Sequence, residues 1–575
     1  MVRIILLFIS FLLLAQFESA EVAKAREELK QGLFIDARDR LVNYLKENPN
    51  SLEALVLLME YYSVYASDPD EVLKYVQVAE DALPRANFLE RVIFSESITY
   101  YKYNALSQKN KYKEAYETLK SLENRGYLPT WYYSSLSWIL FKLGRMEEAL
   151  KAAKDGLKLQ ADHLSSLNMV GILYGVIGKW DESIKAFNRA IEIGKLIGES
   201  VSAPINNLGE VYEELFNETK AIQLYEEAMR SESDCSALLS YVNLGLLYLD
   251  FLDTRSAARV IREYRRCVAR FPFRSPKAFR SLLNLVDARI KYLEGDFKEA
   301  RRLARWILDY DQQLGLVGTD QNDLKVAALQ TLILANQALY RAENLKATTF
   351  TEKLLSQINS VRLKLENWLY GRELHHLLVF KLNRFEDLRI RNTDAFLFYP
   401  FLGFELAKWP KKRTLEMIES QSAKDSRPRA VLYYDLYKAS ISPRENIQRL
   451  KENSLKLRAY YDEALAVGIY SLILQHENNV IDRIRFSNLL FDKWPQAFVV
   501  FDLKLPVKVR GVKLPRRLPF EELNHVPARF ELVAEFEDNE YKVSFFDTKG
   551  RTIIVRDASL KPALRMLALK VFNLL

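Results

Sequence analysis

The fold of this chain is constrained most by pairs of small residues that recur at a fixed interval of twelve positions. The pairs that keep this interval are Ser137 and Ala149, Gly171 and Ser183, Gly209 and Ala221, Gly245 and Ala257, Ala288 and Ala300, and Ala335 and Ala347. A side chain of zero to two heavy atoms at each of two fixed points lets two antiparallel helices approach closely, and such units stack on their neighbours. The spacing therefore predicts a solenoid of paired helices.

Larger residues recur around these pairs in the same register. The first small residue follows a Val or Leu and precedes a Tyr by three positions, and the second precedes a bulky residue by four. Over three successive units these residues are Val170, Tyr174 and Phe187, then Leu208, Tyr212 and Tyr225, then Leu244, Tyr248 and Ile261. The pattern resembles the tetratricopeptide repeat family, most specifically between about residue 96 and about residue 266. The resemblance implies a mainly α fold, a right-handed superhelical solenoid of antiparallel helix pairs.

The repeat pattern weakens on its C-terminal side. Successive second small residues from Ala115 to Ala347 are 34, 34, 38, 36, 43 and 47 positions apart. Longer intervals indicate longer helices or loops, and Asp287 and Lys291 occupy positions that the family fills with Leu and Tyr. We assign residues 21–361 to the repeats and residues 362–495 to an irregular helical continuation.

The pattern changes again after Trp494. The segments 497–503, 529–536, 541–546 and 551–556 are rich in β-formers, and an amphipathic helix capped by Ser559 follows them. Residues 496–575 are therefore expected to form a small C-terminal α+β domain. Lysines, arginines and prolines between 503 and 519 indicate an extended edge segment that resists strand pairing, with an anion site as the alternative.

The first twenty residues have the pattern of a secretory signal peptide. Arg3 supplies a positive n-region, a twelve-residue apolar run follows, and small residues end the segment at Ala20. Glu18 leaves the cleavage point open, so an uncleaved anchor is the alternative. We expect an exported protein, located in a bacterial periplasm or associated with the outer membrane.

Export makes the cysteines informative, because thiols oxidise outside the cytoplasm. The chain has only two, Cys235 and Cys267. Cys235 precedes the first helix of the fourth clear repeat, and Cys267 lies near the end of its second helix. Antiparallel helices bring those two ends together, which predicts a disulfide that closes the repeat. Two semi-buried free thiols are the alternative.

Positive charge is concentrated on one predicted helix face. Five arginines follow steps of four, three, four and four, namely Arg255, Arg259, Arg262, Arg266 and Arg270. They share a face, because residues three and four apart are neighbours on a helix. A row of guanidinium groups suits carboxylates, phosphates or anionic lipid headgroups. The alternative is a solvated outer face.

A partner-binding groove is the second candidate site. Trp131 and Trp138 place aromatic area along one predicted first helix, and Asn168, Asn207 and Asn243 lie on successive first helices. In the tetratricopeptide family, an Asn at this point often bonds the backbone of an extended peptide, so the resemblance implies a concave groove that holds a partner segment. Alternatively, the tryptophans pack between repeats and the asparagines satisfy neighbouring loops.

The sequence offers little for catalysis. The only close pair among its five His is His375 and His376, whose imidazoles point about 100° apart on a helix. No HExxH, GxSxG or GxxxxGK[ST] motif occurs. We expect a non-enzymatic protein with no metal, cofactor or nucleic acid: an interaction scaffold of the cell envelope. In the alternative, the repeats space a C-terminal module that binds an envelope polymer or anionic lipid.

Overall fold

The computed structural model describes residues 19–123, 128–231, 237–270, 277–310, 321–347, 349–383, 416, 419, 438, 442–460, 463–523 and 528–575. The helices up to residue 383 are α2 (Ala20–Lys30), α3 (Phe34–Glu47), α4 (Leu52–Glu60), η1 (Tyr61–Tyr65), α5 (Pro69–Ala82), η2 (Leu83–Arg85), α6 (Phe88–Gln108), α7 (Tyr112–Lys120), α8 (Thr130–Lys142), α9 (Met146–Leu159), α10 (Leu164–Val176), α11 (Trp180–Ile197), α12 (Ser202–Glu214), α13 (Glu218–Ser231), α14 (Leu238–Asp250), α15 (Thr254–Val268), α16 (Lys277–Glu294), α17 (Phe297–Tyr310), α18 (Gln321–Lys346) and α19 (Phe350–Asn383).

The remaining described elements are α23 (Pro443–Tyr460), α24 (Glu463–His476), α25 (Val480–Lys493), α26 (Ala497–Val500) and α27 (Leu560–Val571), with strands β1 (Leu505–Arg510), β2 (Phe520–Glu522), β3 (Phe530–Glu537), β4 (Glu540–Asp547) and β5 (Thr552–Asp557). The chain is thus mainly helical with a small C-terminal sheet region, as the sequence predicts. Among the described helices, none combines the length and apolarity that crossing a membrane requires.

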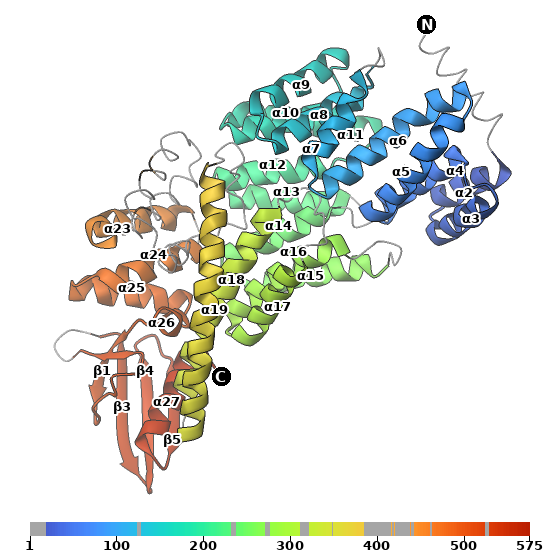
Figure 1. Cartoon of the computed structure of the whole chain (residues 1–575). Helices are drawn as coiled ribbons and strands as arrows, with labels where there is room; N and C mark the ends of the chain where they lie inside the picture. Colours follow the sequence, from blue (N-terminus) through green and yellow to red (C-terminus); the bar gives the residue numbers. More distant parts are fainter. Residues whose placement is uncertain are drawn as a thin grey trace.

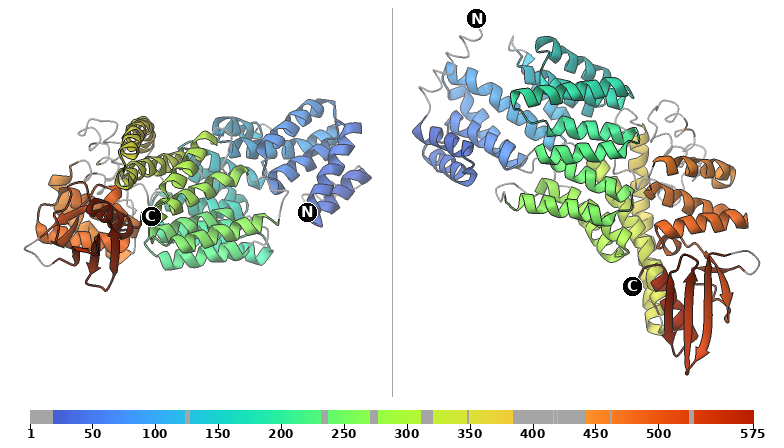
Figure 2. Two further views of the ribbon diagram at one scale, coloured as in Figure 1. Left: turned by 90° about the horizontal axis from the view of Figure 1, so that it is seen from below. Right: turned by 180° about the vertical axis from the view of Figure 1, so that it is seen from behind.

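Consecutive helices from α2 to α19 pack as pairs, and the pairs stack one behind another (Figure 1). The first helices of neighbouring pairs are also in contact: α8 contacts α10, and α10 contacts α12. Figure 2 shows the stack from below and from behind, with the C-terminal sheet at one end and the N-terminal pairs at the other. This arrangement places side chains from successive first helices along one continuous surface.

The predicted small residues lie where paired helices come closest. A Cβ added to Gly171 on α10 would lie 2.7 Å from the ring of Phe187 on α11, and one added to Gly209 would lie 2.7 Å from the ring of Tyr225. Ser183 is fully buried, and its Oγ donates to the carbonyl oxygen of Gly171 at 2.6 Å. Glycine leaves the space that each ring fills, so a large residue on the second helix packs directly against the first helix.

The third seam of this type has more room. A Cβ on Gly245 would lie 3.4 Å from Ile261 and 3.4 Å from Val286, which is ordinary contact. The same small-residue interval occurs in the first pair, where Ala25 and Ala37 are fully buried between α2 and α3.

The C-terminal sheet has the order β2-β1-β3-β4-β5. β1 is parallel to both neighbours, whereas β3, β4 and β5 form an antiparallel meander. Asp538 and Asn539 turn between β3 and β4 with φ of 51° and 66°, the left-handed conformation of tight hairpins. α27 packs on β4 and β5. Ser559 is its N-cap residue, although its side chain makes no capping hydrogen bond.

Two expectations for this region were wrong. Residues 497–503 do not form a strand, because Ala497–Val500 make the short helix α26, whose residues are all buried. β-formers lie there in a helical turn because burial outweighs their local preference. Nor does the basic segment form an edge, since β1 lies between β2 and β3. Pro506 is tolerated within β1 because the ladder to β3 begins only at Lys508.

The C-terminal sheet region is continuous with the helical stack. One apolar core extends from Ala221 in α13 to Leu574 after α27. The buried indole of Trp494 donates to the carbonyl oxygen of Leu293 at 3.1 Å, and the guanidinium of Arg341 in α18 donates to the carbonyl oxygen of Val500. Arg565 in α27 donates to the carbonyl oxygen of Ala347 at 2.9 Å. These contacts fix the sheet region against α16 and α18.

The glycine seams predict opposite effects for one substitution at two sites. Gly171→Ala is expected to lower the free energy of unfolding by about 1 to 2 kcal/mol, because its Cβ overlaps the buried Phe187 ring and overpacking outweighs the gain in helix propensity. Gly245→Ala is the matched control, and it should be neutral or stabilising by up to about 1 kcal/mol. Chemical denaturation measures both changes. Equal effects at the two positions would contradict the seam geometry.

Candidate docking groove

The first helices α6, α8, α10 and α12 line a hollow of about 220 Å³. Its walls include Tyr103 from α6, Ser135 from α8, Asn168 from α10 and Pro204 from α12. The Tyr103 hydroxyl is uncharged at neutral pH, as in any tyrosine, and burial raises its pKa further. The hollow therefore presents neutral groups that donate and accept hydrogen bonds, which suits a peptide backbone better than a charged ligand.

Two of the predicted groove residues are bonded to each other. The Nδ2 of Asn207 donates to the Oδ1 of Asn168 at 3.0 Å, across the boundary between α10 and α12. Both side chains are half-buried. Among the described residues, no other hydrogen bond uses their amides, so the pair keeps the Nδ2 of Asn168 as a donor and the Oδ1 of Asn207 as an acceptor. One donor beside one acceptor matches what each residue of an extended peptide offers.

The third predicted asparagine has a different environment. The Nδ2 of Asn243 donates to the Oδ1 of Asn206 at 3.1 Å and to the Oε1 of Glu210 at 3.0 Å. Asn206 also donates to Glu210 at 3.1 Å and accepts from the hydroxyl of Ser240 at 3.0 Å. This network joins α12 to α14. The sequence did not predict this network, because Asn206 stands next to Asn207 and nothing in the local pattern marks it as buried.

The two tryptophans connect α8 to the preceding repeat. The indole of Trp131 donates to Glu96 at 3.0 Å and meets the Tyr100 ring edge-to-face at 5.0 Å. The indole of Trp138 donates to the hydroxyl of Ser107 at 3.2 Å. Both side chains are half-buried. Their contacts correspond to the alternative that they pack between repeats, and their role in partner binding stays a prediction.

Four of the five predicted arginines lie on α15, and Arg270 lies two residues past its end. Arg255, Arg259, Arg262, Arg266 and Arg270 are all exposed, and none of them makes an ion pair with any described residue. The opposite face of α15 buries Ala257, Val260, Ile261 and Tyr264. Whether an anionic partner binds this row stays a prediction.

The structure describes only one of the two cysteines of the predicted disulfide. Cys267, near the end of α15, is disulfide-bonded. Cys235 lies outside the described residues, and so does the predicted signal peptide up to residue 18. The pairing therefore stays a prediction.

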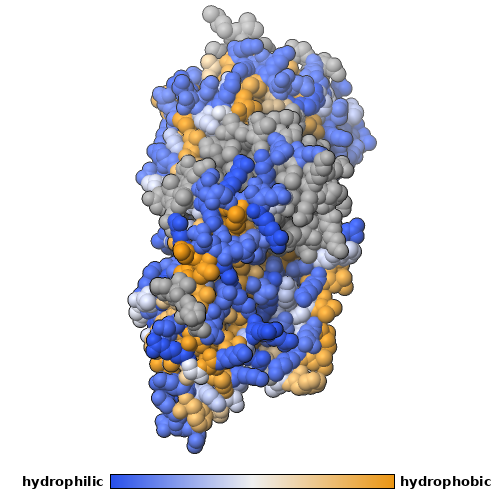
Figure 3. Space-filling model, turned by 90° about the vertical axis from the view of Figure 1, so that its left-hand side faces the viewer, coloured by the Kyte–Doolittle hydropathy of each residue, from blue (hydrophilic) through white to orange (hydrophobic). Residues whose placement is uncertain are grey.

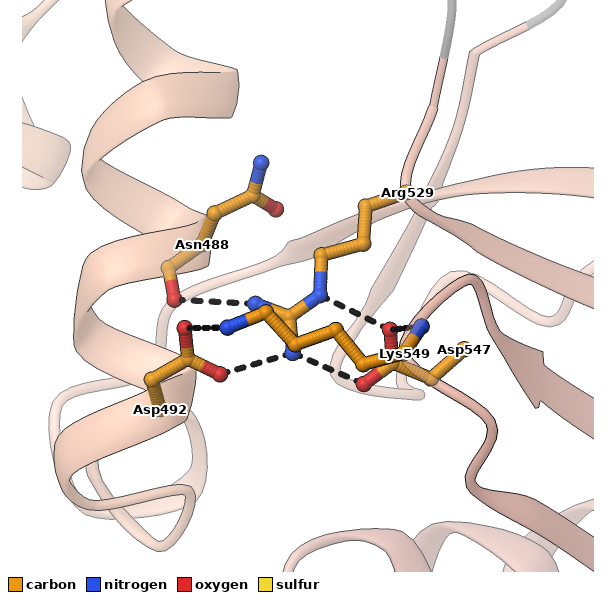
Figure 4. Close-up of polar contacts among 5 residues, drawn as sticks. All are labelled: Asn488, Asp492, Arg529, Asp547 and Lys549. Atoms are coloured by element: carbon orange, nitrogen blue, oxygen red, sulfur yellow. Dashed lines mark hydrogen bonds and ion pairs between the residues drawn. The ribbon is translucent and has the colours of Figure 1, made fainter.

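A cluster of ionisable residues lies where α25 meets the sheet (Figure 4). The guanidinium of Arg529 donates to both carboxylate oxygens of Asp547, at 2.8 and 2.7 Å, and to Asp492 at 2.7 Å. Lys549 donates to the other oxygen of Asp492 at 2.6 Å. The side chains of Arg529 and Asp547 are only 11% and 4% exposed, so the pair is shielded from water.

The charges of this cluster satisfy one another. The hydrogen bond from Arg529 holds the pKa of Asp547 below its usual value. Burial acts to raise the pKa of Asp492, but hydrogen bonds from Arg529 and Lys549 outweigh it and lower that pKa. Both carboxylates are therefore ionised and paired at neutral pH, and neither is poised to exchange a proton. The cluster joins α25 to β3 and β4 and has the arrangement of a structural ion-pair network.

Among the residues that the structure describes, no group of three or more His, Cys, Asp or Glu side chains is placed to hold a metal ion. The half-buried imidazole of His163 contacts the hydroxyl of Ser166 at 2.8 Å, and burial lowers its pKa.

Two models of the tetratricopeptide repeat family match the chain, over residues 132–163 and 162–231. These spans contain the pairs from α8 to α13, with Asn168 and Asn207 on two of their first helices. Residues 132–231 thus carry tetratricopeptide repeats. The resemblance inferred from the small-residue register is confirmed, and the groove is formed largely by recognised tetratricopeptide repeats. Among curated proteins, no match was found.

Solved structures with similar helix arrangements share little sequence with these tetratricopeptide repeats. MamA is 17% identical, with 29% of this chain and 95% of that chain covered at a TM-score of 0.23. YrrB, described as a TPR protein with an unusual peptide-binding site, is 18% identical, and the match covers 34% of this chain and 93% of YrrB with a TM-score of 0.23. A tetratricopeptide repeat protein from Parabacteroides merdae is 16% identical, and the match covers 50% of this chain and 98% of that protein with a TM-score of 0.32. Overlaps of this extent carry no functional argument.

The ion-pair network predicts a pH-dependent stability. Because both aspartates have lowered pKa values, their contribution is complete above the ordinary Asp pKa of about 3.9 and is lost as the pH falls through the lowered values. Asp547→Asn is expected to lower the free energy of unfolding by about 2 kcal/mol at pH 7. The difference from wild type should shrink below about pH 3.9.

Lys549→Ala is the control for this network. Its side chain is 61% exposed, so its loss should cost about 1 kcal/mol or less. Denaturant titrations at neutral and acidic pH measure all three proteins. A difference between Asp547→Asn and wild type that does not change with pH would contradict the assigned role.

Proposed function

We propose that this protein is an exported, non-catalytic scaffold of the cell envelope that docks an extended segment of a partner protein in the concave groove of its repeats. The observation that carries the proposal is the bonded pair of Asn168 and Asn207, which keeps one amide donor and one acceptor beside the hollow. Both groups lie on first helices of recognised tetratricopeptide repeats.

The chemistry of the hollow supports a peptide more than a small substrate. A peptide backbone needs donors and acceptors, and the hollow offers the amide of Asn168 and the hydroxyls of Ser134 and Ser135, of which that of Ser134 already donates to the carbonyl oxygen of Trp131. The one compact ionisable cluster noted above is internally paired and lies at the α25–sheet junction. A repeat solenoid also offers a long surface, which suits a partner that is itself elongated.

Export is the part of the proposal that rests on sequence alone. The basic, apolar and small-residue order of residues 1–20 supports a cleaved signal peptide. A scaffold placed outside the cytoplasm would meet envelope proteins as its partners.

Replacing Asn168 and Asn207 together by Ala is expected to weaken the binding of an extended peptide, selected from a random peptide library, by at least about tenfold. The substitutions remove the donor and acceptor that would bond its backbone. Both positions are half-buried, so the free energy of unfolding should fall by less than about 1 kcal/mol. Titration calorimetry and denaturation measure the two effects.

Asn206→Ala is the matched control for the groove. Asn206 is only 3% exposed and bonds Glu210, Ser240 and Asn243, so its loss should cost about 1 to 3 kcal/mol of stability with little change in peptide affinity. Unchanged affinity in the Asn168→Ala and Asn207→Ala double variant would refute the groove. So would affinity losses that follow stability alone in both proteins.

The export prediction has a direct readout. Mass spectrometry of the protein purified from its host is expected to show a mature chain beginning at Glu21, because a signal peptidase cuts after small residues such as Ala20. A chain retaining residues 1–20 and fractionating with membranes would instead identify an anchor. A full-length chain in the cytoplasm would contradict export.

A further inference from the structure

The long helix α19 has an unusual distribution of polar and apolar residues. Its face toward α18 buries Ser356, Ser360 and Asn367, each at most 6% exposed. These side chains form hydrogen bonds across the pair: Ser356 donates to Asn344 at 2.7 Å, and Asn336 donates to Asn367 at 2.9 Å. The same face also buries Leu363 and Leu374, so α19 is held against its own repeat by polar and apolar contacts together.

The opposite face of α19 exposes large apolar side chains. The exposed fractions are 82% for Phe350, 47% for Leu354, 55% for Leu355, 57% for Ile358, 68% for Val361, 59% for Leu365, 42% for Trp368 and 53% for Leu369. Single exposed apolar residues are ordinary, but a continuous row of them marks an interaction surface. Figure 3 shows apolar side chains gathered at the lower right edge, the side on which α19 lies at the front of Figure 1.

The spacing of this row fits another helix. Leu354, Ile358, Val361, Leu365 and Trp368 follow steps of four, three, four and three. That heptad order is the seam of a helix packed against one partner helix, and Leu355 and Leu369 widen the apolar face on one side of it. Arg372 ends the row one step later and lies over the Trp368 ring at 5.1 Å.

The flanks of the row are basic. Arg362 and Lys364 are exposed on its two sides, and Arg372 is exposed at its end. The acidic residues of α19 between 349 and 374 have partners within the chain: Glu352 caps the helix through Thr349, Glu366 pairs with Arg301 at 2.7 Å, and Glu373 pairs with Lys325 at 2.5 Å. An incoming helix therefore meets positive charge on both edges.

We propose that the apolar row of α19 is a second docking site, which binds an amphipathic helix of a partner protein whose seam is apolar and whose flanks are acidic. A second copy of this chain fits less well, because antiparallel pairing about Val361 would place Arg362 against its own copy. The site uses no residue of the groove, so its test is independent of the proposed function.

A matched pair of synthetic peptides tests the proposal on the full-length protein. Both carry three heptads with Leu at the seam, and their flanking positions are Glu in one and Lys in the other. Fluorescence anisotropy is expected to give at least tenfold tighter binding of the Glu peptide. Ile358→Gln with Leu365→Gln should weaken that binding at least tenfold, and Arg362→Glu with Lys364→Glu should reverse the preference between the peptides.

The controls separate the proposal from its competitors. Leu196→Gln, at an 84% exposed position on α11, and the Asn168→Ala and Asn207→Ala variant should leave Glu-peptide binding unchanged. Equal binding of both peptides, or no loss in the Ile358→Gln and Leu365→Gln variant, would overturn the proposal. Two further results would overturn it, both in the absence of Glu-peptide binding. One is a dimer in sedimentation that the Ile358→Gln and Leu365→Gln variant abolishes, which would make a second copy the occupant. The other is co-pelleting with phosphatidylglycerol vesicles that the same variant abolishes, which would make a lipid surface the occupant.

Discussion

The close contact between a glycine on one helix and a large ring on the next is the constraint on which the rest of this structure depends. Phe187 and Tyr225 fill the space that Gly171 and Gly209 leave open, and Ser183 adds a hydrogen bond to the backbone of α10. Because these seams fix each pair, the first helices of successive pairs come into register. That register brings Asn168 and Asn207 within hydrogen-bonding distance, although they are 39 residues apart.

The stack does not end where the repeat pattern fades. A shared apolar core, the buried Trp494 indole and the Arg565 contact to Ala347 join the sheet region to α16 and α18. The sheet is therefore better described as a cap on the solenoid than as a tethered module. α18, which the cap contacts, holds α19 across the outside of the molecule, where the apolar face of α19 is exposed.

The sequence predicted the parts of the fold that depend on local spacing. The interval between small residues located the seams, and β-rich segments located β3, β4 and β5. It failed where long-range packing decides, as at Ala497–Val500, whose β-formers are buried in a helical turn, and at β1, whose neighbours are set by topology. The Asn206 network and the Arg529 cluster were also missed, because their partners lie 34 and 37 positions away and no local motif marks them.

The most direct measurement of the central claim is a double-mutant cycle between Gly171 and Phe187. If the ring occupies the space beside the glycine, a smaller side chain at position 187 should relieve the overlap that an added methyl group creates. Gly171→Ala should then be less destabilising in a Phe187→Leu background, with a coupling of more than about 1 kcal/mol. Additive effects within about 0.3 kcal/mol would mean that the two residues do not share a seam, and the register of the groove would lose its basis.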